Sequence, residues 1–492
     1  MPEKWKDEGI MQQQGVAKNT TFLTSALVFQ KALTFLYYIF LARLVGPADV
    51  GKFVFAMSFT TMFTIFVDLG LSQVLTREIA RQRDKAEKYL ANVLSIKIIL
   101  ALLAGALVII LINLLNYPSL TKQMVYLATI VMVVDSFQLV FYAVFRGWQN
   151  LKYEAIGMSS GQILIFATGL IGLKLGAHLP ILVIAVLIGS LFQFFWSLFL
   201  VGKKLKIKIG FNLEKSVLKY LLGIAAPFAL YGVFVKVYSY LDTVLLSKLA
   251  GDAYVGWYGI AYKVTFALQF IPAAFAAAIF PAMSAYFVAD KEKLARVFER
   301  SMFYLMVIAL PTSVGLATLA DKIIPQLYSQ NFVGSVLPLQ ILISGLLFIF
   351  LNYPVGNLLN ACNKQKANTM VMGITTAVSV ILNIILIPRY QAVGAAVTSL
   401  VSGALLFFLG LHFVGQVTKY NARFLILSFI KTIIAAGLMG IIIIYLKPTL
   451  PWPILIVLSG ICYFILMFLL KGLTLKDIQS IIVSFWRERS DR

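Results

Sequence analysis

Five lysines lie inside long apolar segments, where a charged side chain is costly and therefore informative about function. Lys31, Lys236 and Lys263 are the deepest, and Lys31 is about eleven residues from the start of its segment, roughly 16 Å in at 1.5 Å per residue. That depth is close to mid-membrane, so in a cavity these ammonium groups could each neutralise an anion as a point charge. Lys97 and Lys431 lie nearer the ends of their segments and are expected to snorkel to the membrane surface.

Buried carboxylates give the competing interpretation of these lysines. Asp68, Asp135 and Asp242 also lie in apolar segments, so each deep lysine could belong to a closed ion pair. Asp242 follows Lys236 by six residues on one segment, a spacing that does not make them neighbours on a helix. We interpret Asp242 as a candidate gate or coupling-ion residue, with an outer-end helix cap as the alternative.

Asp68 lies near the inner end of the second apolar segment. It is a second candidate for a gate or ion-coupling residue. The structural alternative is that its carboxylate pairs with Arg77 or Arg146, which lie at inner ends as well.

The composition excludes a soluble globular chain and a disordered one, since 60% of the 492 residues are hydrophobic and 13% are charged. The net charge of +22 would suggest nucleic acid in a soluble protein, but here the cations flank apolar segments, so no nucleic-acid partner is predicted. Two cysteines and two histidines form no disulfide framework or metal cluster. No phosphate-binding loop is present, so we predict no enzyme, no catalytic residue, no metal and no cofactor.

About fourteen apolar segments are long enough to cross a bilayer, which takes about 20 residues of helix. They fall near residues 20–44, 51–75, 90–114, 122–145, 155–176, 180–202, 218–247, 254–280, 300–320, 335–361, 368–388, 392–416, 424–446 and 452–471. Lysine and arginine gather in alternate connections, which places both termini in the cytoplasm. We therefore predict an all-α, multi-pass protein of the cell membrane.

One stretch occurs twice, 205 residues apart. Of the 32 positions aligned between residues 22–53 and 227–258, ten are identical, including a shared Gly-x-Ala-x-Val-Gly and the alignment of Lys31 with Lys236. Six segments separate the copies, and because six is even the two halves share one orientation in the membrane. The sequence thus predicts two six-helix lobes related by a pseudo-two-fold axis, plus two extra C-terminal helices.

The predicted division of the chain follows from this repeat. It runs as a cytoplasmic tail at 1–17, an N-lobe at 18–202, a basic cytoplasmic linker at 203–217, a C-lobe at 218–416, the two extra helices at 417–471 and a cytoplasmic amphipathic tail at 472–492. The last tail has apolar residues at helical spacing and nearby cations, so we expect it to lie on the inner membrane surface, with a partner-binding helix as the alternative.

Several short motifs, in this order and spacing, resemble the polysaccharide flippase branch of the multidrug/oligosaccharidyl-lipid/polysaccharide exporter superfamily. The motifs are Leu41–Gly51, Asp68–Ser72, Arg77–Ala80, Phe145–Gly147, Leu241–Thr243 and Leu386–Ala396. One departure is Gln391, where the last motif usually has glycine. The resemblance covers nearly the whole chain and implies two six-helix lobes around a central cavity.

The resemblance also implies a function, namely moving an isoprenyl-diphosphate-linked oligosaccharide between leaflets by alternating access. Such a substrate is an anion with an apolar tail, so Lys31, Lys236 and Lys263 become the candidate substrate-binding residues. The expected partners are this lipid-linked oligosaccharide and membrane lipids, with a polysaccharide polymerase or glycosyltransferases as further candidates. An ion gradient or the membrane potential would drive transport.

Two alternative functions are compatible with parts of the sequence. An ion-coupled multidrug or cation exporter of the same superfamily would have a cavity dominated by carboxylates. A membrane-integral glycosyltransferase or polysaccharide polymerase, from a different class, would need acidic or arginine-rich loops outside the bilayer. No connection between the apolar segments is long enough for such a loop.

Overall fold

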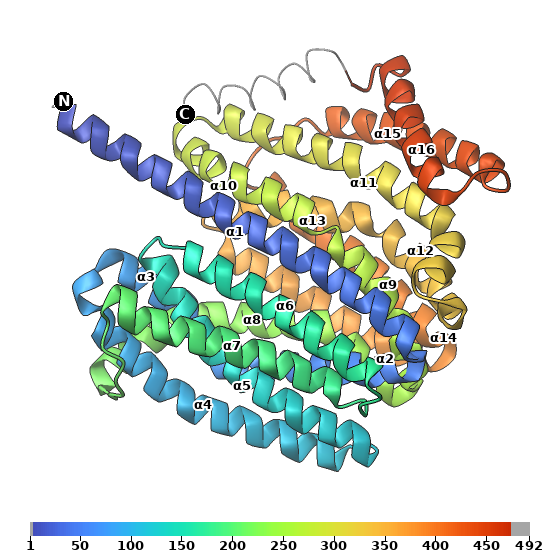
Figure 1. Cartoon of the computed structure of the whole chain (residues 1–492). Coiled ribbons are helices and arrows are strands. Elements are labelled where there is room, and N and C mark those ends of the chain that lie inside the picture. The colour runs from blue at the N-terminus through green and yellow to red at the C-terminus, as the bar shows by residue number, and fades with distance from the viewer. Residues whose placement is uncertain (1–2, 474–492) are drawn as a thin grey trace. The chain divides into compact units, whose positions relative to one another are not determined.

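The computed structural model describes residues 3–473, with side chains for residues 22–226 and 229–473, and every regular element in it is a helix (Figure 1). The helices of the first half are α1 (Glu3–Leu44), α2 (Pro47–Asp68), α3 (Leu71–Arg81), η1 (Arg83–Lys85), α4 (Ala86–Leu114), α5 (Ser119–Gly147), α6 (Lys152–Lys174) and α7 (Ile181–Leu205). Those of the second half are α8 (Lys215–Leu249), α9 (Asp252–Ala267), α10 (Phe270–Ala289), α11 (Lys291–Leu327), η2 (Gln330–Ser335), α12 (Val336–Ser344), α13 (Leu346–Ala361), α14 (Gln365–Gly415), α15 (Ala422–Leu446) and α16 (Trp452–Leu469). From residue 474 onward, the predicted amphipathic tail lies outside the described residues.

Thirteen helical segments of the described chain are long and apolar enough to span a membrane. The fourteenth predicted segment is accounted for by α14, which contains two of the predicted segments and changes direction between them. Gln391 adopts φ 48° and ψ −125° at that point. Such a backbone suits glycine, which explains why the resembling family usually has glycine here.

Three predicted segments are interrupted. Residues 51–75 form α2 and α3, separated by Leu69 at φ 46° and Gly70 at φ 79°, both in the left-handed region. Segment 254–280 divides into α9 and α10, and segment 335–361 into α12 and α13. Apolar composition alone does not reveal such breaks, because a broken helix and a continuous one can be equally apolar.

The described helices form two compact units. Within the described residues, unit 1 contains 3–263 and 372–395, and unit 2 contains 264–371 and 396–473. Helix α8 belongs to unit 1 because it packs along α2. These units do not follow the predicted division at the 203–217 linker, so the division into lobes stays a prediction.

The two copies of the repeat contact each other within unit 1. A Cβ added to Gly51 would collide with the backbone carbonyl of Asp252, and one added to Gly256 would collide with that of Pro47. Gly51 aligns with Gly256 and Pro47 aligns with Asp252, so the contact is reciprocal. Reciprocal contact is what a local two-fold relation produces, and only glycine permits this closeness of two backbones.

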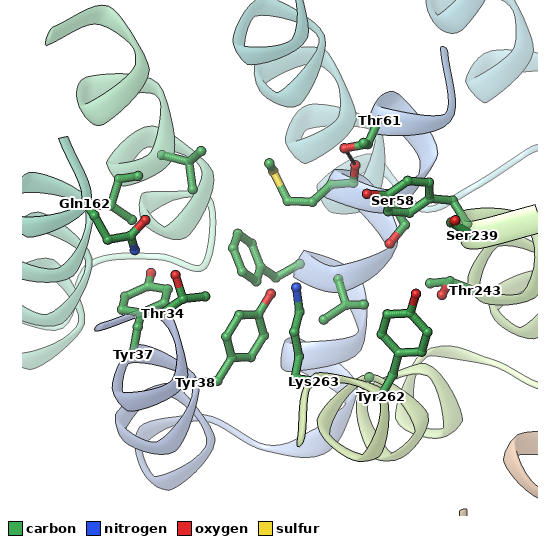
Figure 2. A pocket seen from close by; sticks show the side chains of 17 residues that line it. Thr34, Tyr37, Tyr38, Ser58, Thr61, Gln162, Ser239, Thr243, Tyr262 and Lys263 are labelled. Carbon is green, nitrogen blue, oxygen red and sulfur yellow. Dashed lines mark hydrogen bonds between the residues drawn. The ribbon is translucent and has the colours of Figure 1, made fainter. Parts of the chain in front are cut away.

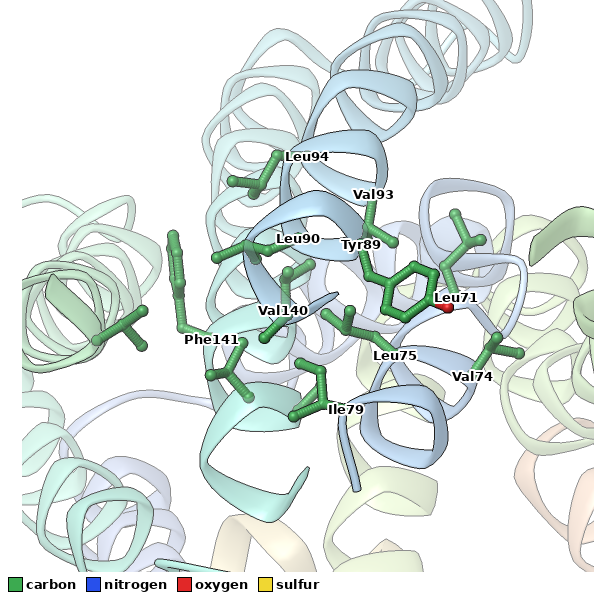
Figure 3. Packing of buried hydrophobic residues seen from close by; sticks show 14 of the residues in the cluster. Leu71, Val74, Leu75, Ile79, Tyr89, Leu90, Val93, Leu94, Val140 and Phe141 are labelled. Carbon is green, nitrogen blue, oxygen red and sulfur yellow. The ribbon is translucent and has the colours of Figure 1, made fainter. Parts of the chain in front are cut away.

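One buried hydrophobic cluster of unit 1 is built mainly from α3, α4 and α5, with further residues from α7 and α8 (Figure 3). Leu75 and Ile79 of α3 face Leu90 of α4 and Val140 of α5, and all four side chains are fully buried. Unit 2 is organised around α11, which contacts α12, α13, α15 and α16. The two C-terminal helices α15 and α16 therefore pack on α11.

Candidate functional site

Three cavities lie within unit 1, and each pair of them shares two lining residues. The first, which we call the lysine cavity, has a volume of 260 Å³ and is lined by Lys263, Tyr38 and Tyr262 among others. Figure 2 shows the Lys263 side chain pointing into it between these two tyrosines. The ammonium lies 4.9 Å from the centroid of the Tyr38 ring, a cation–π distance.

The second cavity, the aspartate cavity, has a volume of 350 Å³ and is lined by Asp68, Asp135 and Lys236. Lys236 comes from α8 and its ammonium lies 5.5 Å from the centroid of the Tyr240 ring. Asp68 attracts this ammonium electrostatically. The aspartate cavity shares Met57 and Thr61 with the lysine cavity, so the two predicted cations line adjoining spaces.

Lys97 does not snorkel, and that prediction was wrong. Its side chain is fully buried, and its ammonium forms an ion pair with Asp68 at 2.6 Å and donates to the Ser136 carbonyl at 2.7 Å. Ser72 donates to the same Asp68 carboxylate at 2.5 Å. The predicted pairing of Asp68 with an arginine was also wrong, because packing places Lys97 of α4 against the break between α2 and α3.

The arginines proposed as partners of Asp68 pair elsewhere. Arg77 bonds the neighbouring Glu78 at 3.1 Å. Arg146 binds Glu154 through Nε at 3.0 Å and through a terminal guanidinium nitrogen at 2.5 Å. Glu154 is fully buried, so the bidentate geometry compensates its loss of hydration. Lys431, in contrast, has an exposed ammonium that donates to the Lys471 carbonyl, as expected of a snorkelling side chain.

Arg146 and Glu154 line the third cavity, which we call the amide cavity because Gln30, Gln138 and Gln193 also line it. Its volume is 300 Å³. It shares Asp135 and Leu139 with the aspartate cavity and Ile165 and Val186 with the lysine cavity. The sequence analysis missed these glutamines, although amides within apolar helices are a signal that can be read from sequence.

Lys31 and Asp242 lie close to these cavities but are not among the residues that line them. Lys31 is partly buried on α1, and the positive charge of Lys263 acts on it electrostatically. Asp242 is buried and accepts hydrogen bonds from the Thr243 backbone nitrogen at 2.6 Å and from the Tyr258 hydroxyl. Its carboxylate thereby links α8 to α9.

Positive charge exceeds negative charge on the cavity walls once the ion-paired side chains are set aside. Among the described lining residues, Asp68 is paired with Lys97 and Glu154 with Arg146. The acidic and basic side chains that then remain on the walls are Lys236, Lys263 and Asp135. The walls carry two ammonium groups against one carboxylate, so they can receive an anionic group.

Comparison with known families assigns the chain. The family model described as "Polysaccharide biosynthesis protein" matches residues 16–287, more than half of the 492 residues. The chain belongs to this family. A second model, MatE, matches residues 227–385 of this polysaccharide biosynthesis family member. The resemblance found from the sequence motifs is thereby confirmed.

Relatives of this family member come from archaea and bacteria. The probable low-salt glycan biosynthesis flippase Agl15 of Haloferax volcanii is 23% identical over 86% of this chain and 89% of its own. The capsular polysaccharide biosynthesis protein CapF of Staphylococcus aureus is 22% identical over 79% of this chain and 96% of its own. The putative O-antigen transporter of Shigella flexneri is 22% identical over 73% and 88%, respectively.

Solved structures agree on the fold. The lipid II flippase MurJ in an inward closed conformation superposes with a TM-score of 0.76 over 90% of this chain and 97% of its own, at 17% identity. An inward-facing multidrug resistance transporter of the MATE family superposes with a TM-score of 0.66 over 80% of this chain and 98% of its own, at 16% identity. The predicted all-α, multi-pass fold class is confirmed, and the chain is a multi-pass membrane protein.

Proposed function

We propose that this polysaccharide biosynthesis family member is a flippase that moves an isoprenyl-diphosphate-linked oligosaccharide from the inner to the outer leaflet. The observation that carries the proposal is the pair of lysines, Lys236 and Lys263, on adjoining cavities inside unit 1. A diphosphate needs cations of this kind, and placing them on a cavity avoids the cost of an ammonium in lipid. The names of Agl15 and the O-antigen transporter support the same substrate class.

Lys31 is the third cation of the proposed site. It follows Gln30, which lines the amide cavity, and it lies three residues before Thr34, which lines the lysine cavity. A turn of helix therefore carries it close to both spaces. The repulsion between Lys31 and Lys263 would be relieved by a bound diphosphate, so the anion is expected to draw the two side chains together.

The reciprocal contact of Gly51 and Gly256 is the observation that supports our proposal of alternating access. Gly51 and Gly256 bring the two repeat copies together at the first turns of α2 and α9. From the distribution of cations we expect these turns on the outer side. Backbones in direct contact leave no room for a ligand to pass. We propose that this crossing closes the outer end in the present state and separates when the substrate leaves.

Asp242 and Asp68 remain our candidates for gating and ion coupling. Asp242 connects α8 to α9 through Tyr258, directly beside the lysine cavity that Thr243 lines. Asp68 contacts Lys97 and attracts Lys236, so its charge state would influence a substrate held by that lysine. Coupling to an ion gradient or to the membrane potential is the energy source that these residues suggest. Both termini are proposed to be cytoplasmic.

The test is transport in vesicles that contain the purified protein and a fluorescent short-chain isoprenyl diphosphate carrying one hexose. An impermeant quencher added outside reports the lipid in the outer leaflet. We expect Lys236→Ala and Lys263→Ala to abolish movement, and arginine at either position to retain part of it because the charge is kept.

Lys431→Ala is the matched control, since Lys431 lies in a membrane-spanning helix of unit 2 and its ammonium donates to the Lys471 carbonyl. It should transport as wild type does. Wild-type movement by the double variant Lys236→Ala/Lys263→Ala would refute the proposed site. The exporter alternative is less well supported, because carboxylates do not dominate the cavity walls once Asp68 and Glu154 are paired.

A further inference from the structure

The amide cavity carries polar groups that take no part in the proposed binding of the diphosphate by lysines. Gln138 of α5, Gln193 and Ser190 of α7 and Gln30 of α1 converge on a space of 300 Å³. Gln138 and Gln193 are each 7% exposed, so their amides are buried and do not lie on the protein surface. The walls of the cavity are formed by α1, α5, α6 and α7. Buried amides in a membrane-spanning bundle are costly unless they are hydrogen-bonded, so their gathering at one cavity calls for a ligand.

The amides form a network that is one donor short. Gln138 Nε2 donates to Gln193 Oε1 at 2.9 Å, and the Tyr142 hydroxyl donates to the same oxygen at 3.3 Å. Gln138 Oε1 is buried and has no hydrogen-bond partner among the described residues. The network therefore presents an acceptor that a ligand hydroxyl can satisfy.

Helix α6 is shaped to admit this network. A Cβ on Gly161 would lie 2.5 Å from Cγ of Gln193, and one on Gly157 would lie 2.8 Å from the Tyr142 hydroxyl oxygen. Any side chain at these positions would push the amide or the tyrosine out of place. The two glycines thus position Gln193 and Tyr142 at the wall of the cavity.

The charges at the cavity favour a neutral ligand. Arg146 is held bidentately by Glu154, so this pair contributes little net charge. Asp135, which lines the amide cavity and the aspartate cavity, would repel a phosphate. An apolar isoprenyl chain would leave the amides without partners. A polyhydroxylated ring satisfies every condition, because each hydroxyl both donates and accepts hydrogen bonds.

We infer that the amide cavity is a saccharide subsite, in which Gln138 and Gln193 bind hydroxyl groups of a sugar residue of the lipid-linked substrate. The inference rests on the proposed function, because it divides the substrate between two adjoining spaces. The diphosphate lies toward Lys263, and the sugar enters the amide cavity past Ile165 and Val186, which the two cavities share. Selection for the glycosylated lipid over the bare lipid is the consequence.

The experiment measures the affinity of the purified full-length protein for two ligands, a short-chain isoprenyl diphosphate carrying one hexose and the same lipid diphosphate without sugar. Wild type should bind the glycosylated lipid more tightly. Gln138→Leu and Gln193→Leu should each weaken binding of the glycosylated lipid by roughly 2- to 10-fold, the value of one hydrogen bond, and leave the sugar-free lipid unchanged. Lys263→Ala should weaken both.

Gly161→Ala is the second variant, because it displaces Gln193 without removing it and should give the same selective loss. Gln340→Leu is the control for loss of an amide in a membrane-spanning helix, since Gln340 donates to the Ala317 carbonyl in unit 2. It should leave the ratio of the two affinities at the wild-type value.

The outcomes separate the two hypotheses. Equal weakening of both lipids by Gln138→Leu and Gln193→Leu, no weakening of either, or a wild type that does not distinguish the two lipids would overturn the saccharide subsite and leave the flippase proposal standing. Failure of wild type to bind or to move either lipid would refute the proposed function and the subsite with it.

Discussion

Breaking the ion pair between Lys97 and Asp68 should destabilise the protein, and replacing Lys97 should cost a different amount from replacing Asp68. The ammonium of Lys97 is 0% exposed, whereas the side chain of Asp68 is 14% exposed and lines the aspartate cavity. Removal of one partner of a buried pair costs about 3–5 kcal/mol, because the other charge is left without compensation. The orphaned group that is more deeply buried should suffer more.

Lys97→Met leaves a carboxylate that can still use the hydroxyl of Ser72 and water in the cavity, so we expect a loss at the low end, about 3 kcal/mol. Asp68→Asn keeps a side-chain oxygen that can accept but removes the negative charge, which leaves a fully buried ammonium without a counter-charge, so we expect about 4–5 kcal/mol. At about 1 °C per kcal/mol for a chain of this size, the melting temperature should fall by about 3 °C and 4–5 °C, respectively.

The assay is thermal unfolding in detergent, read by the amount of protein that remains monodisperse in size-exclusion chromatography. The double variant should lose less than the sum of the single losses, by about 1–3 kcal/mol, because the pair is removed as a unit. Lys431→Met is the matched control and should change the melting temperature little, since its ammonium is exposed. A loss from Lys97→Met no larger than that of the control, or additive single losses, would refute the buried-pair reasoning.

Three further outcomes are expected. Gly51→Val should lower transport, because its side chain collides with the backbone of the other repeat copy, whereas Gly46→Val, which meets nothing within 4 Å, should be tolerated; equal transport by both would count against the crossing. Gln391→Gly should raise the melting temperature by about 1–2 °C, since relief of strain of about 1–3 kcal/mol exceeds the entropic cost of glycine, and an unchanged or lower value would contradict this. Asp290 caps α11, and the backbone N–H groups that it accepts hold its pKa below the usual 3.8. A carboxylate whose pKa is lower in the folded state stabilises that state at pH values above its pKa in the unfolded chain. The fall in melting temperature caused by Asp290→Ala should therefore be full at pH 7 and should shrink as the pH drops below 3.8. A fall that does not depend on pH would exclude the ionised cap.

The sequence determined the class of the protein and most of its helices. In lipid, an apolar run of about 20 residues satisfies its backbone N–H and C=O groups by forming a helix. All fourteen predicted segments are accordingly helical in the structure, three of them with a break. The duplicated stretch identified Gly51 and Gly256 as equivalent before their contact was known. These features are local or periodic, and a linear sequence carries both kinds of information.

Which polar groups meet depends on how the helices pack against one another. Depth along a helix suggested that Lys97 would snorkel, but the helix face on which it lies is turned toward Asp68, 29 residues earlier in the chain. In the same way, Arg146 met Glu154, and Gln138 met Gln193 across two helices. The pairing of faces depends on how helices rotate and cross, which is set by packing of many side chains at once and not by the position of any one residue.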